Sequence, residues 1–81
     1  MDVPGLRARY FDQLLNLVND TEFPSVPMLE RVEQAIREPE QLMGYVEVLL
    51  EKTRSQYPSI ELIKRIDGLI GYLERIDAVA T

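Results

Sequence analysis

The sequence predicts an all-α fold, a compact four-helix domain with short connections. Apolar residues recur at helical spacing in four segments, and Pro, Ser and Asn interrupt the pattern between them. The chain has 81 residues, of which 46% are hydrophobic, which is enough for one core and too little for two domains. We therefore expect a single helical domain over 1–81, with helices at roughly 4–19, 26–37, 39–55 and 59–78.

The first predicted helix, at 4–19, starts near Pro4, a residue suited to a first helical turn. Asn19, Asp20 and Thr21 end it, and Pro24 excludes its continuation. Its apolar residues fall on one broad stripe, formed by Leu6, Tyr10, Phe11, Leu14, Leu15, Leu17 and Val18.

The second predicted helix, at 26–37, has Ser25 as its N-cap, since the serine hydroxyl can accept a bond from a first-turn amide. We expect Glu33 and Arg37, four residues apart, to form a supporting ion pair. Pro39 disfavours helical geometry in the residue before it. It therefore either separates two helices or kinks a longer one, and we favour the separation. The apolar stripe is Met28, Leu29, Val32, Ala35 and Ile36.

The third predicted helix, at 39–55, begins with Pro39 and Glu40, both suited to a first turn. Lys52 and Arg54 lie in its last turn, where positive charge matches the helix dipole. Its apolar residues cover more than half of the circumference: Leu42, Met43, Tyr45, Val46, Val48, Leu49 and Leu50. A helix this apolar is either central in the fold or covered by another chain.

The fourth predicted helix, at 59–78, follows Tyr57 and Pro58, with Ser59 as its N-cap and a Glu61–Arg65 pair on its exposed side. Its apolar residues repeat at spacings of 4, 3, 4 and 3, a heptad seam formed by Leu62, Ile66, Leu69, Leu73 and Ile76.

Two glycines, Gly68 and Gly71, lie inside this last helix, where each costs about 1 kcal/mol relative to Ala. They indicate either close approach of another chain or, within the chain, a kink or a tight crossing with the helix at 4–19.

Composition argues against catalysis and against bound metal. The chain has no Cys and no His, so it lacks thiolate nucleophiles, disulfides and the commonest general base and metal ligand. It also has no glycine-rich phosphate loop and no G-x-S-x-G pattern. The four tyrosines, Tyr10, Tyr45, Tyr57 and Tyr72, form no cofactor box, and we expect half-buried rings with hydroxyls in water. We therefore expect no enzyme, no catalytic residue, no metal and no cofactor.

The net charge of the chain limits the classes of partner that we expect it to bind. Fourteen acidic and nine basic residues give a net charge of −5, which disfavours nucleic acid and anionic membranes as partners. The acidity is concentrated over 20–51, where eight acidic and two basic residues give a net charge of −6. No apolar run approaches the roughly 20 residues needed to span a bilayer. The N-terminal residues do not resemble a secretory signal, and we expect a cytoplasmic location.

The favoured function is a non-catalytic protein–protein interaction module that self-associates, as a homo-oligomer, through the helix at 59–78. A domain this small has a thin core, and association with a partner can supply what the core lacks. The expected interface residues are Leu62, Leu69, Tyr72, Leu73 and Ile76. The competing interpretation is that these residues form the core of the monomer.

Two alternatives stay open. One is a small acidic regulator or inhibitor that covers a basic surface of another protein, with an acidic face formed by Glu30, Glu33, Glu40, Glu47 and Glu51. The other is a carrier of a small apolar ligand, with a pocket among Phe11, Leu15, Val46, Leu50 and Ile66.

Overall fold

The chain forms four α-helices in the computed structural model, which describes residues 1–55 and 59–80, with side chains over 1–54 and 59–77. The helices are α1 (Val3–Asp20), α2 (Val26–Ala35), α3 (Pro39–Ser55) and α4 (Ile60–Ala80). The prediction of an all-α, four-helix domain is confirmed. The predicted break at Tyr57 and Pro58 lies outside the described residues.

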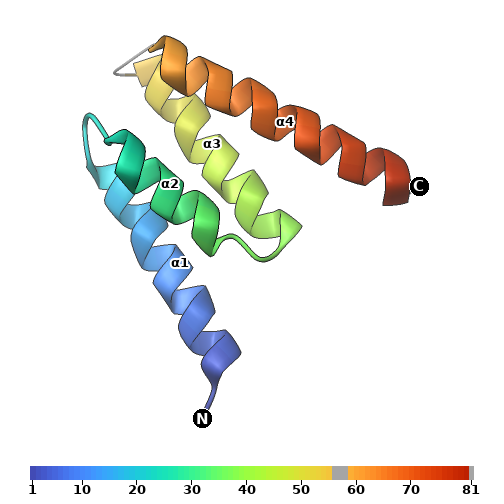
Figure 1. Cartoon of the computed structure of the whole chain (residues 1–81). Helices are drawn as coiled ribbons and strands as arrows, with labels where there is room; N and C mark the ends of the chain where they lie inside the picture. Colours follow the sequence, from blue (N-terminus) through green and yellow to red (C-terminus); the bar gives the residue numbers. More distant parts are fainter. Residues whose placement is uncertain (56–58, 81) are drawn as a thin grey trace.

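Helix α3 is the centre of the fold. It packs against α1 on one side and against α4 on the other, while α2 packs against α1. In Figure 1, α1, α2 and α3 lie side by side, and α4 starts beside the end of α3 and diverges from it towards the C-terminus. The wide apolar arc of α3 is therefore explained mainly by contacts with neighbouring helices of the same chain.

The core is drawn unequally from the four helices. Tyr45 and Leu49 of α3 and Val32 of α2 are completely buried, and burying a large apolar side chain contributes roughly 1.5–3 kcal/mol. Among the side chains described for α4, at 60–77, only Leu62 and Ile66 are buried, both in its first two turns. The buried apolar residues are Phe11, Val18, Leu29, Val32, Ala35, Leu42, Tyr45, Val46, Leu49, Leu62 and Ile66.

Side chains cap the starts of three helices. The hydroxyl of Ser25 accepts a bond from the Met28 N–H at 3.3 Å, and that of Ser59 accepts one from the Leu62 N–H at 3.1 Å. Both predicted caps are confirmed. Helix α1 begins one residue earlier than predicted, because Asp2 caps it by accepting a bond from the Gly5 N–H at 3.0 Å.

Helix α2 ends at Ala35, two residues before the predicted end, and Ile36 is extended. The side-chain oxygen of Gln41 accepts bonds from the N–H groups of Arg37 and Glu38, at 2.7 and 3.1 Å. These bonds hold the segment before Pro39 out of the helix, so the predicted separation of two helices is confirmed. The predicted Glu33–Arg37 pair is wrong.

Arg37 instead serves the end of α2. Its guanidinium donates to the carbonyl oxygens of Gln34 at 2.7 Å and Ile36 at 3.1 Å. These oxygens lie where a helix leaves its carbonyls without internal partners. The arginine is therefore used for capping and not for pairing along the helix.

Lys52 likewise serves a different helix from the expected one. Its side chain is only 4% exposed, and its Nζ donates to the Asn19 carbonyl oxygen at 2.9 Å, at the end of α1. A buried aliphatic stem with a charged tip on a helix C-terminus stabilises both elements. Lys52 thus ties α3 to α1.

Candidate functional site

The C-terminal half of α4 is only partly covered by the rest of the chain. Leu69 and Leu73 pack against the edge of the core, whereas Ile70 and Tyr72 are largely exposed. Figure 1 shows the reason, since α4 leaves α3 along this half of its length. The apolar side of α4 is therefore buried in the core at its first turns and less covered along its C-terminal half.

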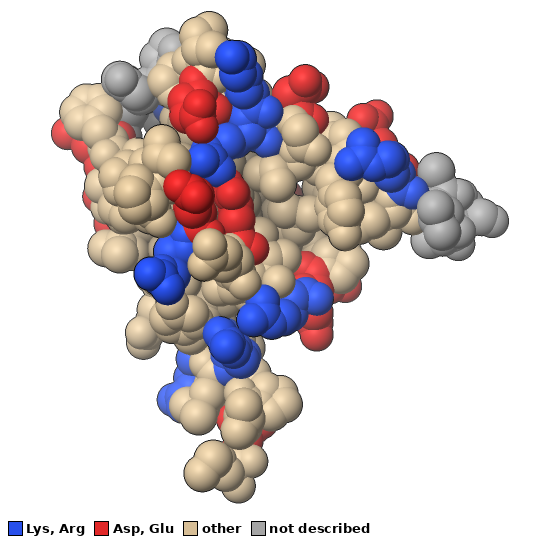
Figure 2. Space-filling model, viewed as in Figure 1, with Lys and Arg blue, Asp and Glu red and all other residues tan. Residues whose placement is uncertain are grey.

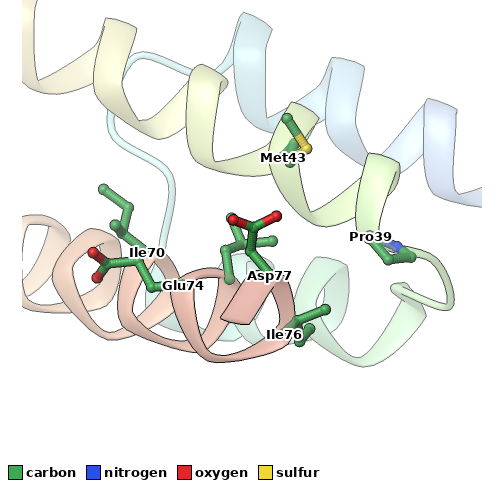
Figure 3. Close-up of a pocket in the computed structure, with 7 residues that line it drawn as sticks. Pro39, Met43, Ile70, Glu74, Ile76 and Asp77 are labelled. Carbon is green, nitrogen blue, oxygen red and sulfur yellow. The ribbon is translucent and has the colours of Figure 1, made fainter. Parts of the chain in front are cut away.

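An open cleft of about 390 Å³ lies where α3 and α4 diverge. Figure 3 shows Pro39 and Met43 of α3 on one side, facing Ile70, Ile76 and Asp77 of α4 on the other. Its surface is mostly apolar, and its carboxylates come from α4. The complete lining is Pro39, Met43, Ile70, Leu73, Glu74, Ile76 and Asp77.

A smaller hollow of about 160 Å³ lies between α4 and the connection that joins α2 to α3. Pro39 and Ile76 line both hollows, and Tyr72 lines the smaller one. The Arg75 guanidinium lies 5.9 Å from the centre of the Tyr72 ring, within range of a cation–π interaction. Space is therefore left between α4 and the start of α3 on two sides.

Exposed apolar side chains continue from the cleft along both helices at helical spacing. Met43 and Leu50 lie seven residues apart on α3, and Ile63 and Ile70 lie seven residues apart on α4. All four are between 38% and 51% exposed. Since seven residues make about two turns, Leu50 lies on the same side of α3 as Met43, and Ile63 lies on the same side of α4 as Ile70. Met43 and Ile70 both line the cleft. We call Met43, Leu50, Ile63 and Ile70 the α3–α4 groove.

Carboxylates flank this groove. Met43 has Glu40 three residues before it and Glu47 four residues after it. Ile70 has Asp67 and Glu74 at the same two offsets. Residues at these spacings lie on the same side of a helix. No basic residue occurs over 39–51, and Arg75 is the single one over 67–77. The groove is therefore acidic at the end formed by Met43 and Ile70, whereas Arg54 lies four residues after Leu50 at the other end.

A polar cluster holds the first half of α4 against α2 and α3. Arg65 of α4 donates to the two carboxylate oxygens of Glu33 in α2, at 2.6 and 2.8 Å, and to Glu61 at 3.1 Å. The Tyr45 hydroxyl of α3 donates to the same Glu33 carboxylate at 2.7 Å. The Glu61–Arg65 pair was predicted, but the contact of Arg65 with Glu33 of α2 was not.

Burial and the negative charge of Glu33 control titration in this cluster. Burial raises the pKa of Tyr45, and the hydrogen bond to Glu33 raises it further. Partial burial lowers the pKa of Arg65, but the hydrogen bond and charge of Glu33 outweigh this effect, so the pKa is raised overall. Tyr45 thus departs from the expected half-buried tyrosine, and Tyr57 lies outside the described residues.

The predicted interface residues of α4 divide into two groups. Leu62 lies in the core of the monomer, and Leu69 packs against the edge of that core. Leu73 lines the cleft, Tyr72 lines the smaller hollow, and Ile76 lines both. Only the second half of the heptad seam is therefore open to a partner. Met43 and Ile70 were not predicted from the sequence, although their seven-residue spacing from Leu50 and Ile63 was a usable signal.

The predicted acidic face is interrupted. Glu30, Glu40, Glu47 and Glu51 are exposed, but the Glu33 carboxylate is bound by Arg65 and Tyr45. Figure 2 shows acidic and basic side chains interspersed over the face that it presents. Of the predicted acidic residues, Glu40 and Glu47 lie beside the exposed apolar side chains of the α3–α4 groove.

The residues predicted for a carrier pocket do not share one environment. Phe11, Val46 and Ile66 are core residues, Leu15 is partly buried, and Leu50 is exposed. The cleft lies at the surface between α3 and α4, and none of these five residues lines it.

The two glycines of α4 face open space. A Cβ atom built on Gly68 meets nothing within 4 Å, and one on Gly71 meets only the Arg75 side chain, at 3.8 Å. The predicted tight crossing with α1 is therefore wrong, because no atom of α1 lies within 4 Å of either Cβ position.

Two properties of the described residues bear on other kinds of site. Over 1–54 and 59–77, no group of three or more Asp or Glu side chains is placed to hold a metal ion. Among the described helices, none is long and apolar enough to cross a membrane.

Comparison with known proteins adds no relative. No protein-family model, no curated protein and no solved structure matches the chain significantly.

Proposed function

We propose that the protein is a non-catalytic protein–protein interaction module that binds its partner at the cleft and the α3–α4 groove. The observation that carries this proposal is a mostly apolar cleft of about 390 Å³, with half-exposed apolar side chains at seven-residue spacing on the two helices that form it. Contiguous apolar surface on a small domain is characteristic of a site where another protein docks.

The shape of this surface favours a protein over a small molecule. Sites for small ligands enclose most of the ligand surface. Here the cleft is open, and the apolar residues continue along two helices for about two turns. Such an elongated groove matches a helix or an extended segment of a partner.

Self-association through α4 is the second candidate. Tyr72 is half exposed beside the hollows, and tyrosine is favoured as an interface anchor. Gly68 faces open space, so a second helix could approach its backbone closely. In this form two copies would cover each other's Ile70, Tyr72 and Ile76, giving a homo-oligomer.

The proposal is tested with an amphipathic peptide whose apolar residues follow a heptad and whose other positions are Gln. Titrated into the ¹⁵N-labelled protein, the peptide is expected to shift the amide resonances of Met43, Ile70 and Leu73. Ile70→Asp should abolish binding, because it places a charge on the exposed groove without altering the core. Leu17→Asp, at an exposed apolar position of α1, is the matched control.

Sedimentation equilibrium of the same proteins separates the two candidates. A dimer that Ile70→Asp dissociates would support self-association. A protein that neither binds the peptide nor self-associates would contradict the proposed function.

A further inference from the structure

We infer that the occupant of the α3–α4 groove is an amphipathic helix of another protein that carries Lys or Arg on both sides of its apolar face. The inference rests on the proposed function and names the partner of the same site. Its basis is that two apolar rows run between two sets of carboxylates.

The apolar rows specify the geometry of the occupant. Met43 and Leu50 are separated by seven residues on α3, as are Ile63 and Ile70 on α4, which corresponds to about 10 Å along each helix. A helix laid between them needs apolar residues at i, i+3 or i+4, and i+7. Met43 and the cleft beside it can accept a larger side chain at one end of that series, because methionine adapts to irregular shapes.

The carboxylates specify the charge of the occupant. Glu40 and Glu47 bracket Met43, while Asp67 and Glu74 bracket Ile70. The occupant would therefore lie between acidic residues on both of its sides. Positive side chains next to its apolar face would meet these carboxylates, and acidic ones would be repelled.

The same charges disfavour a second copy of this chain. A symmetric dimer through the groove would bring the carboxylates of the two copies together, because each copy presents the same surface. Basic residues of the chain do occur together elsewhere, where Arg7, Arg31 and Arg37 line a hollow of about 230 Å³ between α1 and α2. They come from two helices and a connection, and thus do not form one basic amphipathic helix.

The test uses three peptides with the same apolar heptad and with Lys, Gln or Glu at the flanking positions. Binding to the full chain is measured by calorimetry in 50 mM and 300 mM NaCl. At low salt we expect the Lys peptide to bind about tenfold more tightly than the Gln peptide, and the Glu peptide to bind most weakly. The advantage of the Lys peptide should shrink at high salt, because exposed charges are screened.

A pair of double variants tests where this selectivity arises. Glu47→Gln with Glu74→Gln should reduce the advantage of the Lys peptide to about twofold or threefold and leave the affinity of the Gln peptide unchanged. Glu22→Gln with Glu30→Gln changes the net charge equally at exposed positions away from the groove. This control pair should keep most of the difference in affinity between the Lys peptide and the Gln peptide.

The other outcomes separate the two proposals. Equal affinity for the Lys and Gln peptides, with both lost in Ile70→Asp, would overturn the inference about charge and leave the proposed function standing. A dimer that dissociates in Ile70→Asp and excludes all three peptides would overturn the foreign helix in favour of a second copy. The absence of both peptide binding and self-association would overturn the proposed function itself.

Discussion

The two halves of α4 use the same heptad pattern in different environments. Leu62 and Ile66 in the first half are buried against α3 and its neighbours. Leu73 and Ile76 in the second half line open hollows, and Ile70, which lines the cleft with them, is exposed. A heptad identifies which side of a helix is apolar, whereas the path of the helix decides how much of that side the chain covers.

The polar cluster marks the boundary between the two halves. Arg65 binds Glu33 of α2, and Tyr45 of α3 binds the same carboxylate. These bonds fix the first turns of α4 on two other helices. No comparable ion pair with α1, α2 or α3 is seen for the described residues 67–76 of α4, which is consistent with a half that a partner can cover.

The largest expected effect contrasts the core with the groove. Leu49→Ala should lower the free energy of unfolding by about 3 kcal/mol, because it leaves a cavity at a completely buried site. Ile70→Ala should cost less than about 1 kcal/mol, since the side chain is exposed. Urea denaturation measures both. A large loss of unfolding free energy in Ile70→Ala would show that the groove belongs to the core and would contradict the difference between the two halves of α4.

Removing the carboxylate of the polar cluster should have the next largest effect. Glu33→Gln is expected to cost about 2 kcal/mol, because Arg65 loses its ion pair in a partly buried position. The matched variant Glu30→Gln, at an exposed position of the same helix, should change stability by less than about 0.5 kcal/mol. Thermal denaturation of the two variants would show equal stability if the cluster contributed nothing.

Tyr45 should make stability depend on pH in alkaline solution. Its pKa in the folded protein lies above the usual value near 10, because of burial and the hydrogen bond to Glu33. Above about pH 10 the unfolded chain releases this proton while the folded protein retains it, so ionisation favours unfolding. The free energy of unfolding should therefore fall by up to about 1.4 kcal/mol per pH unit from this group alone.

Tyr45→Phe is the control for that dependence. The variant lacks the hydroxyl, so its stability should fall less steeply between pH 10 and 11, although it begins from a lower value at pH 7. Urea denaturation across this range compares the two slopes. Equal slopes would mean that Tyr45 titrates in the folded protein as it does in the unfolded chain.

The smallest expected effect concerns the outer side of α4. Gly68→Ala should raise the free energy of unfolding by about 0.5–1 kcal/mol, because alanine favours a helix and its Cβ meets no neighbour. If two copies associate through close contact at Gly68, the same change should also weaken the dimer in sedimentation equilibrium. A loss of monomer stability would show that the backbone at Gly68 requires glycine.

Local patterns explain which parts of the fold were predictable. Hydroxyl caps at Ser25 and Ser59 act within one turn, and Pro39 constrains its own neighbours, so their effects follow from short segments. Contacts between distant segments could not be predicted from such short segments of the sequence. Lys52 reaches Asn19, and Glu33 pairs with Arg65 in place of Arg37.

The site was predictable only in part for the same reason. The heptad spacing identified Leu73 and Ile76, and the predicted interface also included Tyr72; all three line the hollows. It also included Leu62, which the fold buries. To distinguish the residues that line the hollows from the buried Leu62, one must know the angle at which α4 leaves α3. This angle depends on packing between helices, so it cannot be predicted from the apolar pattern of one helix.

The most direct test of the central claim is the titration of the ¹⁵N-labelled protein with the Lys-flanked amphipathic peptide. We expect the amide shifts to concentrate at 39–50 and 63–77, on both sides of the α3–α4 groove, and Ile70→Asp to abolish them. Shifts centred on Arg7 and Arg31 between α1 and α2, or no shifts at all, would contradict it.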